Sequence, residues 1–371
     1  VSRSTIRQNV QYNLSLRVFL THDKFSAIRE TFDNPALFDS PATYYRSNRL
    51  ENGNMSTNPT FLITCPFQIK FLTLIVTFAC LVTPIVSRTL WEPSVTEISA
   101  PSDGTIIQLK EDQSKIQIAG LKGTLDRTSL SSLGKVTEIR ILKNEIRQIE
   151  TGALCPSENL KVLELDLSGN KNPPTLTKGM FSDCNLEELF LKFDYNNPST
   201  MDKNALEGLH NLKVLGIDSL RFTHLEKNFL VVAKNLTSLT LSNIHVATID
   251  EDVFEQFTDL EALEIVHNIE LEHIPQGLFN RCVKLKTLNL RDNAIKNLSW
   301  DEFQGLSSLE ELSLGDNRIE NFDADKIAKN LPKLKTLSVE INAAGCEKEE
   351  QFVRTLKSKF DRSINVSSNK N

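Results

Sequence analysis

The densest group of side chains that could carry out chemistry consists of His267, Glu270, Glu272 and His273. Imidazole and carboxylate groups can bind a zinc ion, but this group contains no histidine pair at helical i, i+4 spacing and no cysteine partner. We therefore interpret it as a solvated polar turn. The acidic run 250–252 is interpreted as the cap of a helical turn that carries Phe254, with calcium binding as the lesser alternative.

Motifs of known catalytic centres are missing from the sequence. There is no Gly-x-Ser-x-Gly, no His-Glu-x-x-His and no glycine-rich phosphate loop. The formal net charge of −6 argues against a nucleic-acid partner, because nucleic-acid binding usually needs a basic face. We expect a protein that is not an enzyme, needs no cofactor or metal, and binds a protein ligand or co-receptor through a surface.

The elements that would build such a surface are marked by leucines at fixed spacing. Three copies read Leu-x-x-Leu-x-Leu-x-x-Asn or a close variant, beginning at Leu285, Leu309 and Leu334. A unit of this length cannot bury its own apolar side, so successive units must stack. The third apolar position recurs every 23 to 26 residues, at Ile118, Ile141, Leu165, Leu191, Ile217, Leu241, Ile265, Leu290, Leu314 and Val339.

This spacing resembles the leucine-rich repeat superfamily, in its typical 24-residue extracellular type, from about residue 113 to residue 342. The resemblance implies an α/β solenoid: a curved horseshoe of about ten repeats with a parallel β-sheet on its concave face. The chain is similar to secreted or Toll-like ectodomain proteins of arthropods. That similarity implies recognition of a protein or microbial ligand, in innate immunity or in cell adhesion.

Two further positions of each repeat fit the family. A phenylalanine recurs in the second half of three units, at Phe254, Phe279 and Phe303, where a helical or irregular turn would pack under the strands. The family's asparagine ladder is expected at Asn144, Asn268, Asn293, Asn317 and Asn342. Its slot is taken by Asp194, Leu220 and Ile244 in the middle repeats, and by either Ser168 or Asn170 in one other.

The chain divides into six segments. Residues 1–54 show no periodicity and are interpreted as a non-native upstream region or a tail, and residues 55–87 as a signal peptide that begins at Met55. Residues 88–112, with a strand at 106–109, should cap the repeats of 113–345. At the other end, 346–362 is expected to form an amphipathic capping helix and 363–371 a disordered tail.

Residues 71–86 decide the compartment. They form an uncharged apolar run of sixteen residues after Lys70, too short for an ordinary membrane span and interrupted by Pro84. This pattern favours a cleaved signal and a secreted protein. The alternative is an uncleaved anchor, which would make the chain a type II protein of the plasma membrane, with an adhesion or receptor role.

Modification sites bear on the same question. Glycosylation sequons after the apolar run begin at Asn235, Asn297 and Asn365. Four cysteines also follow that run. Cys184 and Cys282 occupy the same slot of their repeats, which favours buried, unpaired thiols. The alternative is a disulfide between Cys155 and Cys184, in adjacent repeats.

Residues between the inward leucines should face a partner, because side chains alternate across a strand. Most of them are polar, but one group is aromatic or apolar. It is predicted to form a binding patch on the N-terminal half of the concavity, because aromatic anchors often dominate protein–protein binding energy. The alternative is that these aromatics pack on one another or under a loop. The patch comprises Leu142, Val162, Phe190, Lys192, Phe193, Tyr195 and Val214.

Overall fold

The computed structural model describes residues 96–99 and 113–368, apart from 143, 198, 228 and 231–232. The predicted signal segment 55–87, the upstream region and the predicted cap strand at 106–109 lie outside these residues. Within them, no helix is both long and apolar enough to cross a membrane.

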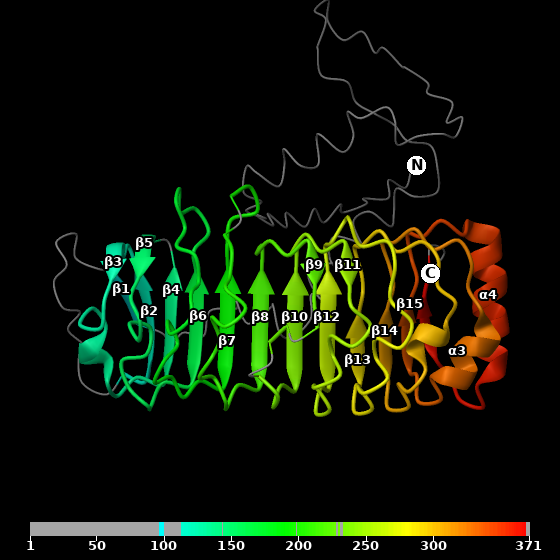
Figure 1. Cartoon of the computed structure of the whole chain (residues 1–371). Coiled ribbons are helices and arrows are strands. Elements are labelled where there is room, and N and C mark those ends of the chain that lie inside the picture. The colour runs from blue at the N-terminus through cyan, green and yellow to red at the C-terminus, as the bar shows by residue number, and fades with distance from the viewer. Residues whose placement is uncertain are drawn as a thin grey trace, which may run out of the picture. The chain divides into compact units, whose positions relative to one another are not determined.

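The described chain is built around one twelve-stranded parallel sheet (Figure 1). Strands adjacent in this sheet follow one another along the chain, so each turn of the solenoid adds one strand beside the last. This confirms the predicted solenoid with its sheet on the concave side. In order, the strands are β1 (Thr96–Ser99), β2 (Lys115–Ala119), β4 (Glu138–Leu142), β6 (Val162–Asp166), β7 (Glu188–Lys192), β8 (Val214–Asp218), β10 (Ser238–Ser242), β12 (Ala262–Val266), β13 (Thr287–Asn289), β14 (Glu311–Ser313), β15 (Thr336–Ser338) and β16 (Asn365–Ser367).

Pairing keeps the repeat register throughout. For example, Leu215 of β8 faces Leu189 of β7 and Leu239 of β10. All ten residues of the aligned apolar position are at most 1% exposed, from Ile118 to Val339. The alternating inward side chains therefore form continuous apolar rows, and each row is buried by the repeats on either side.

Aromatic residues fill the convex side of the C-terminal repeats. The ring centroids of Phe254 and Phe279 lie 6.4 Å apart at an interplanar angle of 6°, and those of Phe279 and Phe303 lie 6.2 Å apart at 11°. All three rings are at most 1% exposed. The segments that carry them are turns, with one 3-10 helix at Asp301–Phe303, as the spacing predicted.

Asparagine side chains connect consecutive repeats. The side-chain oxygen of Asn317 accepts from the Ile295 backbone nitrogen at 3.1 Å, and its amide donates to the Leu290 carbonyl at 2.8 Å. Asn342 makes the same contacts one repeat later. Asn170, rather than Ser168, fills the ambiguous slot, because it is 3% exposed and its amide donates to the Ile146 carbonyl at 2.8 Å. The predicted ladder is thus present.

Two short parallel pairs lie outside the main sheet. They are β3 (Lys122–Leu125) with β5 (Glu145–Ile149), and β9 (His224–Leu225) with β11 (Thr248–Ile249). A 3-10 turn at Ser131–Leu133 precedes β4. These elements join neighbouring turns away from the sheet and help to fix their spacing.

The C-terminal end is capped by two helices and a strand. Helix α3 (Ala324–Asn330) packs on α4 (Cys346–Lys359), and the rings of Phe322 and Phe352 stack at 4.9 Å. The prediction of a disordered tail at 363–371 was wrong for its first half, because β16 pairs with β15. Ile364 and Val366 alternate with polar residues and are 4% and 6% exposed, a two-residue period that the polar composition of the segment conceals.

Candidate functional site

The candidate site is the solvent side of the twelve-stranded sheet, called here the sheet face. Each five-residue strand turns its second and fourth side chains into the core and its first, third and fifth to this face. Because neighbouring strands pair without offset, equivalent side chains stand in rows across the repeats. Such a platform can present a fixed array of side chains to a partner.

Phe190 is the central aromatic residue of the predicted patch. It is half-buried in the middle of β7, with Glu164 of β6 on one side and Gly216 of β8 on the other. A Cβ atom built on Gly216 would lie only 2.8 Å from Cδ1 of Phe190, so the ring covers this glycine. Phe190 is therefore a sheet-face residue that packs partly on its neighbour.

Phe193 does not belong to the sheet face, so that part of the patch prediction was wrong. It is 1% exposed and joins the core, because the strand alternation that turns Leu191 inward continues to the residue two positions later. Leu142, Val162 and Val214 are half-buried on the sheet face. Val162 and Val214 are separated by the carboxylate of Glu188, and these positions do not form one continuous apolar strip.

Lys192 and Tyr195 are the exposed members of the patch. The Lys192 ammonium group lies 3.6 Å from an oxygen of Asp166. Tyr195 is 51% exposed, and its ring stacks on His245 with centroids 5.4 Å apart. Whether these residues bind a partner stays a prediction.

Tyr195 lies in one of two long loops that follow β6 and β7 and project beyond the carboxyl ends of the strands (Figure 1). These loops belong to the two steps of 26 residues in the repeat. They are joined to each other, because the Asn197 amide donates to the Lys171 carbonyl at 2.9 Å and the Gly169 backbone nitrogen donates to Asp194 at 3.3 Å. The loops therefore form one connected rim beside Phe190 and Lys192.

A charged network on the sheet face begins next to Phe190. The Arg140 guanidinium lies 3.0 Å from an oxygen of Glu138 and 3.5 Å from one of Glu164, and Lys115 lies 3.2 Å from Glu138. Burial raises the pKa of Glu164, and the positive charge of Arg140 partly opposes that effect. The repeat pattern of the sequence gave no sign that these residues pair across strands.

A second network on the C-terminal half was missed from the sequence. Arg291 lies 2.5 Å from Asp316, 2.7 Å from Glu340 and 3.7 Å from Asp292. Burial raises the pKa of Asp316 to about 6 and also raises the pKa of Asp292. His267 lies 3.5 Å from Asp292, which extends the network to a fourth repeat.

The described residues contain no cluster of three or more metal-ligating side chains. Glu272, from the group that the sequence singled out, pairs with Lys296 at 2.7 Å, and His267 turns to Asp292. The side chains therefore point to different partners. Asp250 accepts a hydrogen bond from the backbone of Lys227 in the preceding repeat, at 2.8 Å.

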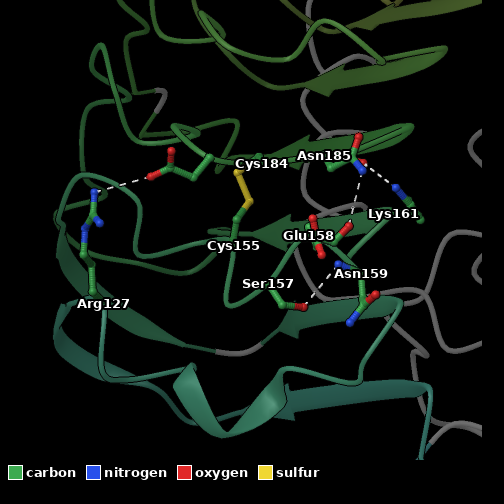
Figure 2. The surroundings of a disulfide bond; sticks show 9 residues. Arg127, Cys155, Ser157, Glu158, Asn159, Lys161, Cys184 and Asn185 are labelled. Carbon is green, nitrogen blue, oxygen red and sulfur yellow. Dashed lines mark hydrogen bonds and ion pairs between the residues drawn. A yellow bond between two sulfur atoms is a disulfide. The ribbon is translucent and has the colours of Figure 1, made fainter.

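A disulfide joins Cys155 and Cys184, whose Cα atoms lie 5.3 Å apart (Figure 2). It links the turn that precedes β6 to the turn that precedes β7, and Arg127 reaches past it to Asp183 at 3.7 Å. The alternative of a disulfide is thus confirmed, and the favoured prediction of an unpaired thiol was wrong for Cys184. That prediction is confirmed for Cys282, a buried free thiol whose pKa burial raises to about 12.

The three sequon asparagines, Asn235, Asn297 and Asn365, are all exposed. Asn235 lies in a turn and Asn297 in a segment without regular secondary structure, whereas Asn365 is the first residue of β16. Each is therefore open to solvent, and glycosylation of these residues stays a prediction.

Two family models match the chain. Residues 258–319 match a model described as leucine rich repeat, and residues 123–242 match one described as BspA type leucine rich repeat region. Among solved structures, the Toll–Spatzle complex of Drosophila matches with a TM-score of 0.50 and 23% identity, over 61% of this chain and 30% of the other. That likeness concerns the fold.

Curated relatives include osteomodulin of Bos taurus, 28% identical over 53% of this chain and 44% of the relative. Leucine-rich repeat-containing G-protein coupled receptor 5 of Homo sapiens is 32% identical over 31% of this chain and 12% of the receptor. Podocan-like protein 1 of Mus musculus is 27% identical over 50% and 32%. The chain thus spans less than half the length of these relatives.

Proposed function

Because the chain is a leucine-rich repeat protein, we propose that it is an extracellular recognition module that binds a protein or microbial ligand through its sheet face. Innate immunity is the setting that we propose for this recognition, and cell adhesion is compatible with the same repeat type. No catalytic or cofactor-dependent role is included in this proposal.

The sheet face is the observation that carries the proposal. Its side chains stand on paired strands, so they are ordered before any partner arrives, and a partner loses little of its binding energy to ordering them. Phe190, Lys192 and Tyr195 combine an aromatic ring, a cation and an exposed phenol beside the connected rim. Rings of this kind are frequent anchors of protein interfaces.

The extracellular setting is supported by the disulfide between Cys155 and Cys184. Disulfides persist in oxidising compartments and are rare in the cytosol. The exposed sequons are compatible with the same route.

Expression of the tagged full chain in a secretory insect cell line tests the compartment. Tagged protein in the medium, shifted by an enzyme that removes N-glycans, is the expected result. Full-length protein retained in membranes would instead favour the cell-surface adhesion or receptor alternative, and unglycosylated cytosolic protein would contradict both.

Binding through the sheet face is tested against arrayed extracellular proteins and microbial cell-wall preparations. The double variant Phe190→Ser/Lys192→Glu should lose each partner that the unaltered protein retains. Lys335→Glu is the matched control, because Lys335 is an exposed cation outside the patch, paired with Glu310. A partner that is kept by the double variant and lost by the control would refute binding through this face.

A further inference from the structure

A shallow hollow of about 340 Å³ lies at the turns that lead into β8, β10, β12 and β13. These turns are at the amino ends of the strands, away from the rim formed by the loops after β6 and β7. The residues that line it are all polar or charged, namely Asn211, Lys213, Asn235, Thr237, Asp259, Glu261 and Lys284.

The hollow exists because a row of ion pairs is interrupted. In most of these repeats the residue directly before the strand is charged and forms an ion pair with the same position of an adjacent repeat. Lys213 pairs with Glu187 at 2.7 Å, and Lys286 pairs with Glu261 at 2.7 Å. Thr237 occupies the same position before β10, and its short side chain pairs with neither neighbouring charge. The long side chains on either side thus become the walls of an open space.

Asn235 stands at this gap with its amide held in place. Its Nδ2 atom donates one hydrogen to the His210 carbonyl at 2.8 Å, which leaves the second Nδ2 hydrogen for another bond. Leu236 is fully buried, so the two polar residues of the Asn235-Leu236-Thr237 sequon lie on either side of a core residue and both line the hollow.

We propose that the hollow is the seat of the first sugars of an N-linked glycan on Asn235, an inference that rests on the secretory route of the proposed function. Attachment forms a bond from Nδ2 to sugar C1 and breaks the bond from C1 to the diphosphate of a lipid-linked oligosaccharide. The displaced amide proton leaves with the diphosphate.

The side chains that line the hollow can bind a sugar through both their polar ends and their methylene groups, as N-linked sugars present both hydroxyl and C–H groups. Ammonium, carboxylate and amide groups can donate to and accept from hydroxyl and acetamide groups, and no aromatic or wholly aliphatic side chain lines the space. Neither Asn297 nor Asn365 is among the lining residues, so the structure singles out one of three sequons. A seated glycan would also cover the amino-end edge and leave the opposite rim free.

The test uses the full chain with a heterologous secretory signal placed before it, so that entry into the pathway does not depend on residues 71–86. Glycans are released by an amidase from native and from denatured protein, and each site is followed by peptide mass spectrometry. We expect release at Asn235 to be roughly tenfold slower in the native protein than in the denatured one, the effect of about 1.4 kcal/mol of seating. One or two net hydrogen bonds supply that amount.

Two double variants test whether the hollow is the cause of slow glycan release at Asn235. Asp259→Ala/Lys284→Ala removes a wall pair of the hollow, 2.5 Å apart, and should restore rapid release. Glu310→Ala/Lys335→Ala removes an exposed ion pair between other repeats on the same edge and should change nothing. Thr237→Val should abolish the glycan at Asn235 alone.

An unoccupied Asn235, or equal acceleration by both double variants, would overturn the proposal. Failure of secretion without the added signal would count against the proposed function only, and the two failures are thereby distinguished.

Discussion

The side-chain oxygen of Asn293 accepts a hydrogen bond at 2.9 Å from the backbone nitrogen of Asn268, one repeat earlier. Its amide donates to the carbonyls of Ile265 and Leu290 at 2.7 and 2.8 Å. One buried side chain thus satisfies three backbone groups from two turns. Each repeat is fixed to the preceding one by polar contacts as well as by apolar packing.

Replacing this side chain should be costly. We expect Asn293→Ala to lower the free energy of unfolding by about 3 kcal/mol, because it leaves buried donors and acceptors without partners. Urea denaturation measures the change, and exposed Asn297→Ala serves as the control, with an expected change within about 0.5 kcal/mol. Equal effects of the two substitutions would show that the ladder contributes little.

Replacing Ile341 should stabilise the fold, because the backbone at this residue is left-handed with φ at 58°. A β-branched side chain is strained in that region. The equivalent positions of five preceding repeats share the conformation and are Ser219, Asn243, His267, Asp292 and Asp316. Ile341→Asn should raise the free energy of unfolding by about 1 kcal/mol, whereas Ile341→Val should not. Thermal melts distinguish the two, and the prediction is refuted if the valine variant gains as much.

Phe190 and Phe193 should lose different amounts of stability when each is truncated to alanine. Phe193→Ala removes a fully buried ring and should cost about 3–5 kcal/mol of stability. Phe190→Ala removes a half-buried ring above Gly216 and should cost about 1 kcal/mol. Denaturation of both variants in parallel gives the comparison, and similar losses would mean that Phe190 is also a core residue.

Phe190 and Phe193 illustrate which features could be predicted from the sequence. Period and phase predicted the sheet and its inward rows, because those depend only on spacing. Phe193 could have been assigned to the core from strand alternation and from Leu167, which occupies the same position one repeat earlier and is fully buried. The partners of Arg291 could not be predicted, because Asp292 and Asp316 adopt left-handed backbones, where alternation no longer gives a side chain's direction.

The free energy of unfolding should depend on pH through Asp316, a partner of Arg291. Burial raises the folded-state pKa of Asp316 to about 6, above 3.8 for the unburied group, so the folded protein binds this proton more readily than the unfolded chain. The stability gained from protonating Asp316 is complete below about pH 4 and is lost as the pH rises through about 6. Lowering the pH from 7 to 5 should therefore stabilise the unaltered protein more than Asp316→Asn. Urea midpoints at the two pH values provide the measurement, and an identical shift in both proteins would contradict it.

The disulfide should contribute measurably to stability. Cys155→Ser/Cys184→Ser should lower the free energy of unfolding by about 3–4 kcal/mol, given the 29-residue separation of the two cysteines. The unaltered protein in reducing buffer should match the variant.

Cys282 should stay unreactive toward thiol reagents until the chain unfolds, because its raised pKa suppresses the thiolate. Labelling of Cys282 in the folded state would show that the thiol is accessible.

The same disulfide has a mechanical consequence. Each turn of the solenoid touches only its neighbours, so a force applied to the chain ends peels turns away one after another. The covalent bridge between Cys155 and Cys184 withholds the 29-residue segment between them from that extension. About 100 Å of contour length stays hidden until the bridge is reduced. Under a stretching force, the redox state of this disulfide therefore sets the maximum extension of the chain.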